Sequence, residues 1–351
     1  MGMSKKPKVY YIHRRILSLE GFLDLIKMPE LNSDLEWDGD SPDILFGSEW
    51  IYYDKTCYKE FCRLWPKAKI RVFLAFEAIT PDMNLFDYAV GFNNHFQLDG
   101  DRFFRIMSPV HFFAGFIPTY ENDIQNEDEA RTCLDAKTGF CNFLYTNGHA
   151  HPMRDRLFFE LSKYKNVDSW GRHLNNVGGG KKYSPQSDWR KESSDIKSAY
   201  KFSIASENAC FRGYTSEKIY TSLLAHTVPV YWGNPDVSED VNPEAFINVN
   251  DFDSIEDLLE RIEYIDHHDD VWMDMVSKPW MTEHQMEQHM LRTEIFKKRM
   301  KDIFFGDFES NQRLYQGTHQ DFYRNRFLYN SYLKTPKLYT IRRLLWKMNK
   351  R

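Results

Sequence analysis

Long apolar runs are missing from this chain of 351 residues. The best candidate, Ser222 to Trp232, is short and is interrupted by polar residues and a proline, whereas a membrane-spanning helix needs about 20 apolar residues. The first eight residues also lack the apolar core of a secretory signal. We therefore expect no spanning helix, no secretion and a cytoplasmic location.

Cysteine is scarce, and its five copies form no Cys-x-x-Cys pair. An odd number without that spacing argues against a disulfide framework or a zinc site, and favours free thiols in a reducing compartment. The cysteines are Cys57, Cys62, Cys133, Cys141 and Cys210. Nothing in the sequence marks any of them as reactive.

A large excess of charge is also absent, because the chain has 46 basic and 51 acidic residues and a net charge of −5. The chain as a whole is therefore not a polyanion binder. Residues 322–351 differ, since they contain nine basic residues and no acidic one, which leaves −14 on the rest. Apolar residues recur at helical spacing between Ile341 and Met348, a pattern typical of a helix on an anionic membrane surface. The alternative is a basic helix packed on the acidic body of the protein.

A composition of 42% hydrophobic and 28% charged residues is that of a folded protein, and the length fits two domains. Short apolar runs alternate with amphipathic stretches in both halves, which predicts an α/β fold with mostly parallel sheets. The expected strands cover residues 8–12, 43–46, 70–76, 88–92, 140–145, 202–205, 228–231 and 246–249. The expected helices cover residues 17–28, 153–164 and 216–225, and one more begins at the capping pair Ser254 and Asp257.

Two Rossmann-like domains that face a central cleft are the arrangement this pattern favours. The polar, acidic stretch Glu121–Thr138 is the expected link between them, and Lys181–Lys197 is expected to be a surface excursion. We therefore divide the chain into a first domain of residues 1–138, a second domain of residues 139–305 and a basic helical tail of residues 306–351.

The most informative stretch runs from Lys201 to Phe252 and is predicted to form a strand, a loop, a helix and another strand. Gly213 lets the loop approach a ligand closely, and Glu217 and Lys218 fall in the first turn of the helix. Free N–H groups and the helix dipole attract anions to such an end, and Lys218 adds a full charge. This position suits a nucleotide diphosphate at the carboxyl edge of a parallel sheet. The alternative is a solvated Glu-Lys pair.

At this stretch the sequence resembles the α-1,3/4-fucosyltransferases of glycosyltransferase family 10, of the bacterial type. The resemblance rests on six blocks that occur in order. They are PDILFGS (Pro42–Ser48), FLAFEAITPDMNLFDYAVGF (Phe73–Phe92), FCNFLYTNGHAHPMRDR (Phe140–Arg156), ENACFRGYTSEKI (Glu207–Ile219), HTVPVYWGNP (His226–Pro235) and VNPEAFINVNDF (Val241–Phe252). The resemblance implies a GT-B fold, in which the first domain binds the acceptor and the second binds GDP-fucose.

The resemblance also implies the site residues. Its catalytic base corresponds to Glu77, at the carboxyl end of the strand 70–76. The neighbouring Phe73 and Phe76 are expected to exclude water and raise the pKa of this carboxyl, as suits a base, whereas the alternative is a glutamate in solvent. The donor-binding residues correspond to Arg154, Asn208, Tyr214, Glu217 and Lys218. Arg156 is the alternative to Arg154, because the assignment depends on where a gap is placed when this block is matched to the family.

Each donor-site residue has an expected role. Arg154 and Lys218 are expected to neutralise the diphosphate as GDP leaves. Tyr214 and Asn208 are expected to donate hydrogen bonds to phosphate oxygens. Glu217 is expected to bind hydroxyls of the ribose or the sugar, because a carboxylate beside a leaving phosphate would repel it.

The function that the resemblance implies is inverting transfer of L-fucose from GDP-β-L-fucose to an N-acetylglucosamine, lactosamine or lactose unit, with Glu77 as general base. Fixed cations stabilise the leaving diphosphate, so no cofactor is required and a divalent metal ion is at most stimulatory. The expected partners are GDP-fucose, an oligosaccharide or glycolipid acceptor and an anionic membrane surface, and not nucleic acid. The alternatives are a GT-B transferase for another nucleotide sugar and a catalytically silent sugar-binding protein.

Overall fold

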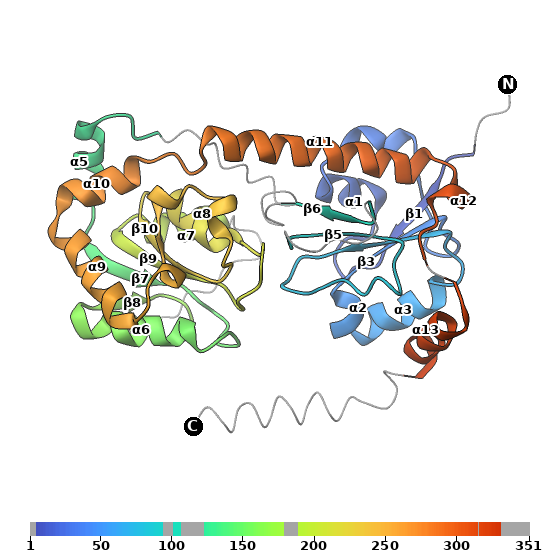
Figure 1. The fold of residues 1–351 in the computed structure, drawn as a ribbon, viewed down its shortest axis with the longest axis horizontal. Coiled ribbons are helices and arrows are strands. Elements are labelled where there is room, and N and C mark those ends of the chain that lie inside the picture. The colour runs from blue at the N-terminus through green and yellow to red at the C-terminus, as the bar shows by residue number, and fades with distance from the viewer. Residues whose placement is uncertain (1–4, 94–100, 107–122, 179–188, 315, 331–351) are drawn as a thin grey trace. The chain divides into compact units, whose positions relative to one another are not determined.

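The computed structural model describes residues 5–93, 101–106, 123–178, 189–314 and 316–330 (Figure 1). The chain divides into two compact units, the first from residues 1–91, 96–104 and 295–351, the second from residues 92–95 and 105–294. The expected boundaries at 138 and 305 do not match this division. The described residues 123–138 belong to the second unit, and residues 295–314 belong to the first.

The first unit is built on a sheet with the strand order β2-β1-β3-β4-β5-β6, in which β1 to β5 pair in parallel. The strands are β1 (Lys8–Tyr11), β2 (Glu36–Trp37), β3 (Ile44–Ser48), β4 (Ile70–Leu74), β5 (Tyr88–Gly91) and β6 (Phe103–Arg105). The helices are α1 (Leu19–Leu25), α2 (Trp50–Tyr53), α3 (Lys55–Leu64), α12 (Phe308–Asn311) and α13 (Thr318–Asn330). Figure 1 shows α1 on one side of the strands and α2 and α3 on the other, which explains why β3 is buried along its whole length.

Helix α11 (Glu283–Phe305) begins in the second unit and ends in the first. In the first unit, α13 packs on the loop before β5, where Tyr323 Oη donates to Asp82 (2.6 Å) and Arg324 Nε donates to the Asn84 carbonyl (2.8 Å). This part of the expected tail therefore packs on the body of the protein. The amphipathic pattern from Ile341 to Met348 lies outside the described residues, so membrane binding by that segment stays a prediction.

The second unit is built on a sheet with the order β11-β10-β9-β7-β8, and each neighbouring pair is parallel. The strands are β7 (Gly139–Phe143), β8 (Val167–Ser169), β9 (Tyr200–Ser206), β10 (Val228–Trp232) and β11 (Ile247–Asn248). The helices that lie wholly in this unit are α5 (Glu127–Asp135), α6 (Met153–Tyr164), α7 (Trp189–Lys197), α8 (Glu217–Leu223), α9 (Ile255–His267) and α10 (Asp269–Ser277).

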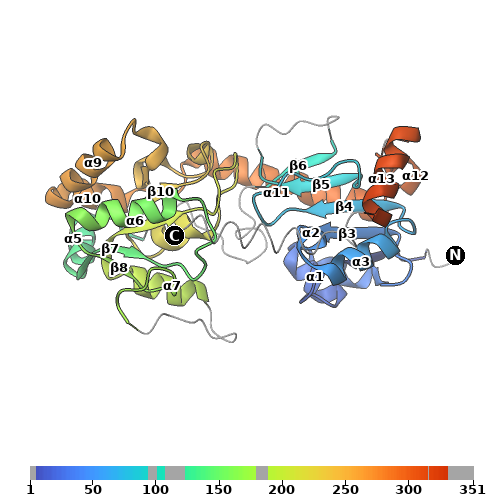
Figure 2. The same cartoon turned by 90° about the horizontal axis from the view of Figure 1, so that it is seen from below.

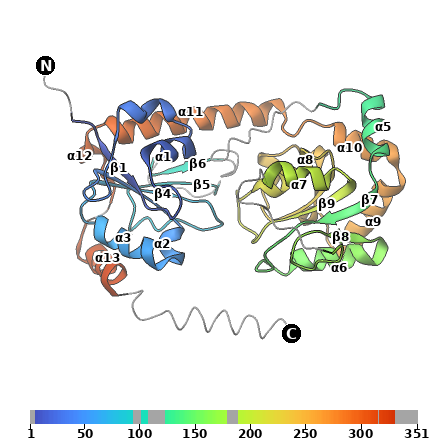
Figure 3. The same cartoon turned by 180° about the vertical axis from the view of Figure 1, so that it is seen from behind.

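Two apolar clusters cover the two faces of the second sheet. Along β10, Val230 and Trp232 belong to the cluster formed with α5, α6, α9 and α10, while Tyr231 belongs to the cluster formed with α8. This alternation follows from the two-residue repeat of a strand. Figure 2 shows α6 and α7 on opposite sides of β7, and Figure 3 shows α7 and α8 side by side over β9.

Most of the expected elements are present, but two segments differ. The expected link contains α5, which packs on α10 through Ala130 and Leu134 in the core of the second unit. The expected surface excursion ends in α7, whose residues Ser193 and Lys197 are buried. Within the described part of the chain, none of the helices has both the length and the apolar character needed to cross a bilayer.

Candidate functional site

The candidate site is a pocket of about 250 Å³ in the second unit. It lies where β7 and β9 end, where α6 and α8 begin and where α7 ends. Its lining residues are Leu144, Tyr145, Thr146, Asn147, Arg154, Ser193, Lys197, Ile204, Asn208, Glu217, Lys218 and Thr221. The structure therefore brings together four of the five expected donor-binding residues at the carboxyl ends of parallel strands, where α/β sheets bind ligands.

The side chain of Arg154 is held rigidly in this pocket. Its guanidinium stacks on the ring of Tyr145 at 4.1 Å, and Nη2 donates to the carbonyl of Ser206 (2.9 Å) and to Oδ1 of Asn208 (2.7 Å). Arg154 is 1% exposed, and none of the described residues accepts a hydrogen bond from its buried Nε. A fixed guanidinium with an unused donor is suited to bind an anion. Arg156, the alternative assignment, is exposed on α6 and does not line the pocket.

A buried carboxylate organises the start of α8. Glu207 is fully buried after β9, and it accepts hydrogen bonds from the Ser216 N–H (2.7 Å) and the Ser216 hydroxyl (2.6 Å). Lys218 Nζ lies 3.2 Å from Glu207 and 3.3 Å from Glu217. A carboxylate of the protein itself, that of Glu207, therefore lies at the start of this helix. Because α8 has only seven residues, the charge of Lys218 matters more here than the helix dipole.

The two acidic partners keep Lys218 charged. Burial alone would lower the pKa of Lys218, but the carboxylates of Glu207 and Glu217 outweigh it and raise this pKa above its usual value. Burial would likewise raise the pKa of Glu217, but Lys218 and hydrogen bonds to the carboxylate lower it. Lys218 and Glu217 are therefore both ionised at neutral pH.

Tyr214 is the expected donor-site residue that the structure does not bring into the pocket. Its ring is 3% exposed and packs edge-on against Phe92 at 5.1 Å, and it does not line the pocket. The predicted hydrogen bond from Tyr214 to a phosphate oxygen therefore has no support from this arrangement. Gly213 beside it has a φ of 79°, a left-handed conformation that glycine adopts without strain.

The predicted base, Glu77, lies in the first unit, in the loop that follows β4. Its side chain is exposed, so the expected exclusion of water by Phe73 and Phe76 is not present within this unit. A second carboxyl group, Glu49, is buried beside it and accepts a hydrogen bond from the Phe76 N–H (3.2 Å). Burial raises the pKa of Glu49 to about 7, and the charge of Glu77 acts in the same direction.

Comparison with known proteins identifies the family. The family model described as "Glycosyltransferase family 10 (fucosyltransferase) C-term" matches residues 134–304, the segment that contains the whole pocket. These residues belong to glycosyltransferase family 10. The matched segment covers most of the second unit and contains four of the six sequence blocks.

Two curated relatives extend the match. An α-(1,3)-fucosyltransferase of Helicobacter pylori is 27% identical over 274 residues, which cover 70% of this chain and 54% of that protein. A putative fucosyltransferase of Acanthamoeba polyphaga mimivirus is 32% identical over 188 residues, which cover 53% of this chain and 31% of that protein. The chain therefore spans about half or less of the length of these relatives.

Solved structures support the fold. An α1,3-fucosyltransferase crystallised with GDP has a TM-score of 0.62 at 23% identity, and the match covers 88% of this chain and 95% of that one. A DNA-modifying β-glucosyltransferase has a TM-score of 0.50 at 11% identity. The chain therefore has the two parallel-sheet α/β units of GT-B glycosyltransferases. The predicted cleft between the units stays a prediction.

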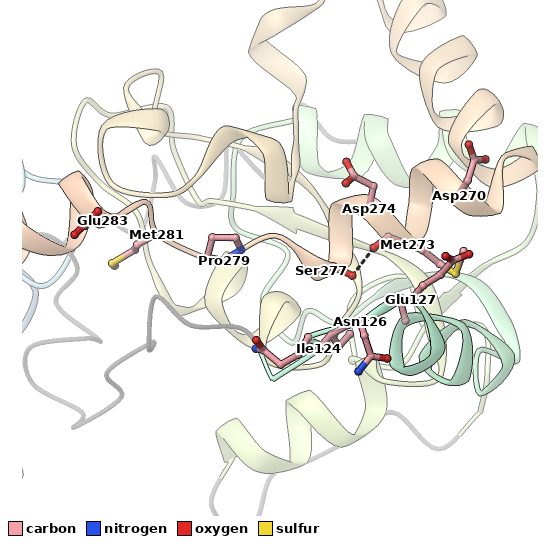
Figure 4. Close-up of a pocket in the computed structure, with 12 residues that line it drawn as sticks. Ile124, Asn126, Glu127, Asp270, Met273, Asp274, Ser277, Pro279, Met281 and Glu283 are labelled. Atoms are coloured by element: carbon pink, nitrogen blue, oxygen red, sulfur yellow. Dashed lines mark hydrogen bonds between the residues drawn. The ribbon is translucent and has the colours of Figure 1, made fainter.

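A larger cavity of the second unit, about 760 Å³, lies away from these residues (Figure 4). Its wall combines apolar side chains of α5 and α10 with the carboxylates of Glu127, Asp270, Asp274 and Glu283. Figure 4 shows Asp270 and Asp274 along one helix, α10, with Glu127 nearby. Four carboxylates would repel a diphosphate, so the smaller pocket, which contains Arg154 and Lys218, is the better candidate for an anion site.

Three residues of the family 10 pocket were missed by the sequence analysis. The ring of Tyr145 stacks on the guanidinium of Arg154, and Glu207 accepts hydrogen bonds from Ser216 at the start of α8. Lys197 contributes a further amine to the lining. Glu207 opens the block that carries the resemblance, so its position at a strand end was an available signal. Lys197 gave no such signal, because it lies in a polar segment whose contacts only the fold creates.

The loop between β9 and α8 also contains Cys210, which is exposed. The other four cysteines are buried or partly buried, and all five are free thiols. The loop itself is fixed at both ends, by Arg154 on Asn208 and by Ser216 on Glu207. Cys210 therefore lies on the accessible side of a loop whose ends form part of the pocket.

Proposed function

We propose that the protein is an inverting α-1,3-fucosyltransferase. It transfers L-fucose from GDP-β-L-fucose to a hydroxyl of an N-acetylglucosamine, lactosamine or lactose unit. The observation that carries the proposal is the pair of fixed cations, Arg154 and Lys218, in a pocket of the family 10 domain. A relative from Helicobacter pylori is described as an α-(1,3)-fucosyltransferase, and one structural neighbour contains GDP-fucose.

The donor pocket acts on the leaving group. As the bond between the anomeric carbon and the β-phosphate oxygen breaks, negative charge grows on the diphosphate. The guanidinium of Arg154 and the ammonium of Lys218 stabilise this charge, and their contacts hold them in place before the reaction begins. Loss of one such fixed donor typically raises the barrier by about 2.7–4 kcal/mol. Glu217, held ionised by Lys218, is available to accept a hydroxyl of the ribose or the sugar.

The predicted base acts on the acceptor. The Glu77 carboxylate takes the proton of the acceptor hydroxyl, and the oxygen attacks the anomeric carbon on the face opposite GDP. One C–O bond forms as another breaks, so the configuration is inverted in a single step. The exposed position of Glu77 at the end of β4 leaves its carboxylate accessible to a sugar. General-base catalysis contributes about 10²–10⁴-fold to a rate.

The first experiment measures GDP release from GDP-fucose with and without N-acetyllactosamine or lactose, in the presence of EDTA. We expect acceptor-stimulated release that persists in EDTA and falls about 10²–10⁴-fold in Glu77→Gln. Glu20→Gln, an exposed glutamate in the first turn of α1, is the control and keeps full activity. Unchanged release in Glu77→Gln would contradict the assignment of the base but not of the family.

The second candidate function is transfer from another nucleotide sugar, because the roles proposed for Arg154 and Lys218 concern only the diphosphate and do not select the base or the sugar. A panel of GDP-linked and UDP-linked sugars separates the two. Stimulated release from a different donor, with none from GDP-fucose, would replace the proposal.

A further inference from the structure

Lys197 is a buried lysine in the wall of the donor pocket. It is the last residue of α7 and only 5% exposed. Its Nζ lies within hydrogen-bond distance of Thr221 Oγ1 (2.7 Å), Ser222 Oγ (3.0 Å) and the Lys218 carbonyl (3.2 Å). The two hydroxyls can donate to a neutral amine or accept from a protonated one. All three partners are neutral, and none of the described carboxylates lies within ion-pair distance of this amine. The fold thus keeps a basic group out of water without a direct counter-charge.

The charge balance of the pocket depends on this lysine. The two fixed cations, Arg154 and Lys218, are matched by the two carboxylates, Glu207 and Glu217. The four groups together carry no net charge. The protonation of Lys197 therefore decides whether the empty pocket is neutral or positive, and a diphosphate needs a positive pocket.

The surroundings of Lys197 shift its pKa toward neutral pH. Burial lowers the pKa of Lys197 to about 7, with Glu217 and Glu207 acting to raise it and Lys218 acting to lower it. These charged groups face Lys197 from α8 and from the end of β9, and Arg154 adds a positive charge from α6. An arriving diphosphate brings two or more negative charges, which favour the protonated amine.

We propose that Lys197 is the third cation of the donor pocket and that it takes up a proton from solvent when the diphosphate enters. The inference rests on the proposed function, since it assumes a nucleoside diphosphate as the ligand. No covalent bond changes. One proton moves from the buffer to Nζ on binding and returns when the nucleotide leaves. Lys197 thereby makes donor affinity depend on pH in the neutral range.

A purely structural role is the competing explanation. Through Ser222, Lys197 joins a buried polar network, because Ser222 Oγ donates to Ser203 Oγ (3.1 Å) and Ser203 Oγ donates to Asn142 Oδ1 (3.0 Å). A lysine that only fastens α7 to α8 would lower stability when replaced. It would not change the number of protons bound with the ligand, so proton uptake separates the two roles.

The test is calorimetry of GDP binding to the full chain at pH 7.5, in two buffers with different ionisation enthalpies. We expect wild type to take up as much as about three quarters of a proton per GDP, the unprotonated fraction of a group with a pKa of about 7. Above pH 7 the association constant should fall by as much as tenfold per pH unit. Guanosine, which has no phosphate, should cause no uptake.

Two variants complete the test. Lys197→Met should lose the proton uptake and the dependence on pH, and should bind GDP more weakly at pH 6.5. Lys137→Met is the matched control, because Lys137 is a partly buried lysine of the same unit. It donates to the carbonyls of Ser198 (2.8 Å) and Ala225 (3.2 Å) and does not line the pocket. This control should keep the uptake of wild type.

The outcomes are distinct. Binding of GDP to wild type without proton uptake overturns the inference and leaves the proposed function intact. Equal uptake in Lys197→Met also overturns it, because the proton then goes elsewhere. If Lys197→Met does not fold, the wild-type comparison of GDP with guanosine still decides. If wild type binds no GDP, the proposed function fails, and the inference fails with it.

Discussion

Glu49 is a carboxyl group that folding removes from water. It is 4% exposed, and burial raises its pKa to about 7 against an ordinary value of 4.5. Well below pH 4.5 the group is protonated in both the folded and the unfolded chain, so it does not change the free energy of unfolding. As the pH rises to 7, the unfolded chain releases a proton that the folded chain retains, so stability falls. The loss is complete only above the folded-state pKa, by about pH 8, and amounts to roughly 3 kcal/mol.

Compared with wild type, Glu49→Gln should therefore stabilise the first unit more at pH 8 than at pH 5. An amide keeps an oxygen to accept the Phe76 N–H and carries no charge at either pH. Urea unfolding at the two pH values measures the effect, with the exposed Glu20→Gln as control. A stability difference that does not change with pH would contradict the shifted carboxyl.

A second prediction at this scale concerns Gly233, which lies against Glu207. Its φ is 156°, and a Cβ there would lie 2.4 Å from Glu207 Cγ. Gly233→Ala should displace the carboxylate from Ser216 and Lys218, cost about 1–3 kcal/mol of stability and weaken GDP binding. Melting temperature and a GDP titration measure both effects.

The control for this substitution is Gly178→Ala. Gly178 has a φ of 82° but open space around it, so its replacement strains the backbone without crowding a neighbour. It should cost about 1–2 kcal/mol and leave GDP binding unchanged. Equal loss of GDP binding in both variants would show that contact with Glu207 is not the cause.

At the scale of elements, the helices that the sequence predicts well are those with an apolar face. Helix α6 occupies residues 153–164 as expected, and the capping pair at the start of α9 is present, with Ser254 Oγ accepting from the Asp257 N–H (3.1 Å). The strand β10 was predictable because it is a continuous apolar run, and β9 because residues 202–205 are mostly apolar. The strands β2 and β6, of two and three residues, are too short to produce a pattern.

The elements and site residues that were missed share one physical cause. Helix α7 buries Ser193 and Lys197, polar residues that hydrophobic periodicity does not count. The fully buried Glu207 is a charged residue, and only tertiary contacts give it partners. The four pocket residues Arg154, Asn208, Glu217 and Lys218 were expected together from motifs. The residues that fix their positions and their charge depend on the packing of α7 and α8 against the sheet.

Helix α1 gives a prediction of its own at this scale. It ends in a left-handed residue, Lys27, with a φ of 56°, and the Met28 N–H donates back to the Leu23 carbonyl (2.9 Å). Because glycine adopts this conformation without strain, Lys27→Gly should stabilise the first unit by about 1 kcal/mol. Lys27→Ala removes the same exposed side chain but keeps the strain, so it should bring no such gain. Urea unfolding of both variants measures the difference.

At the scale of the whole molecule, the chain passes between the two units near residues 91–105 and again within α11. In the second unit, both passages are tied to Asp240, which is fully buried. Its carboxylate lies 2.5 Å from Arg105 Nη2 and 3.2 Å from Arg292 Nη1, and Arg105 Nε also donates to the Phe92 carbonyl (2.9 Å). One carboxylate thus anchors the segments through which the units are joined.

Asp240→Asn should cost about 3 kcal/mol, because it leaves two partly buried guanidinium groups without their buried counter-charge. The control is Asp269→Asn, whose ion pair with Arg131 is about half exposed and worth about 1 kcal/mol or less. Thermal unfolding of both variants measures the contrast. Equal losses of stability in the two variants would contradict the larger contribution assigned to Asp240.

The exposed thiol at Cys210 has a practical consequence. Burial raises the pKa of the thiols of Cys57, Cys62, Cys133 and Cys141, which slows their reaction with alkylating reagents, while Cys210 is open to solvent. A maleimide dye should therefore attach at this one position without mutagenesis. The label would sit on the loop that joins Asn208 to the start of α8, and its fluorescence would give a direct optical signal of nucleotide arrival and departure.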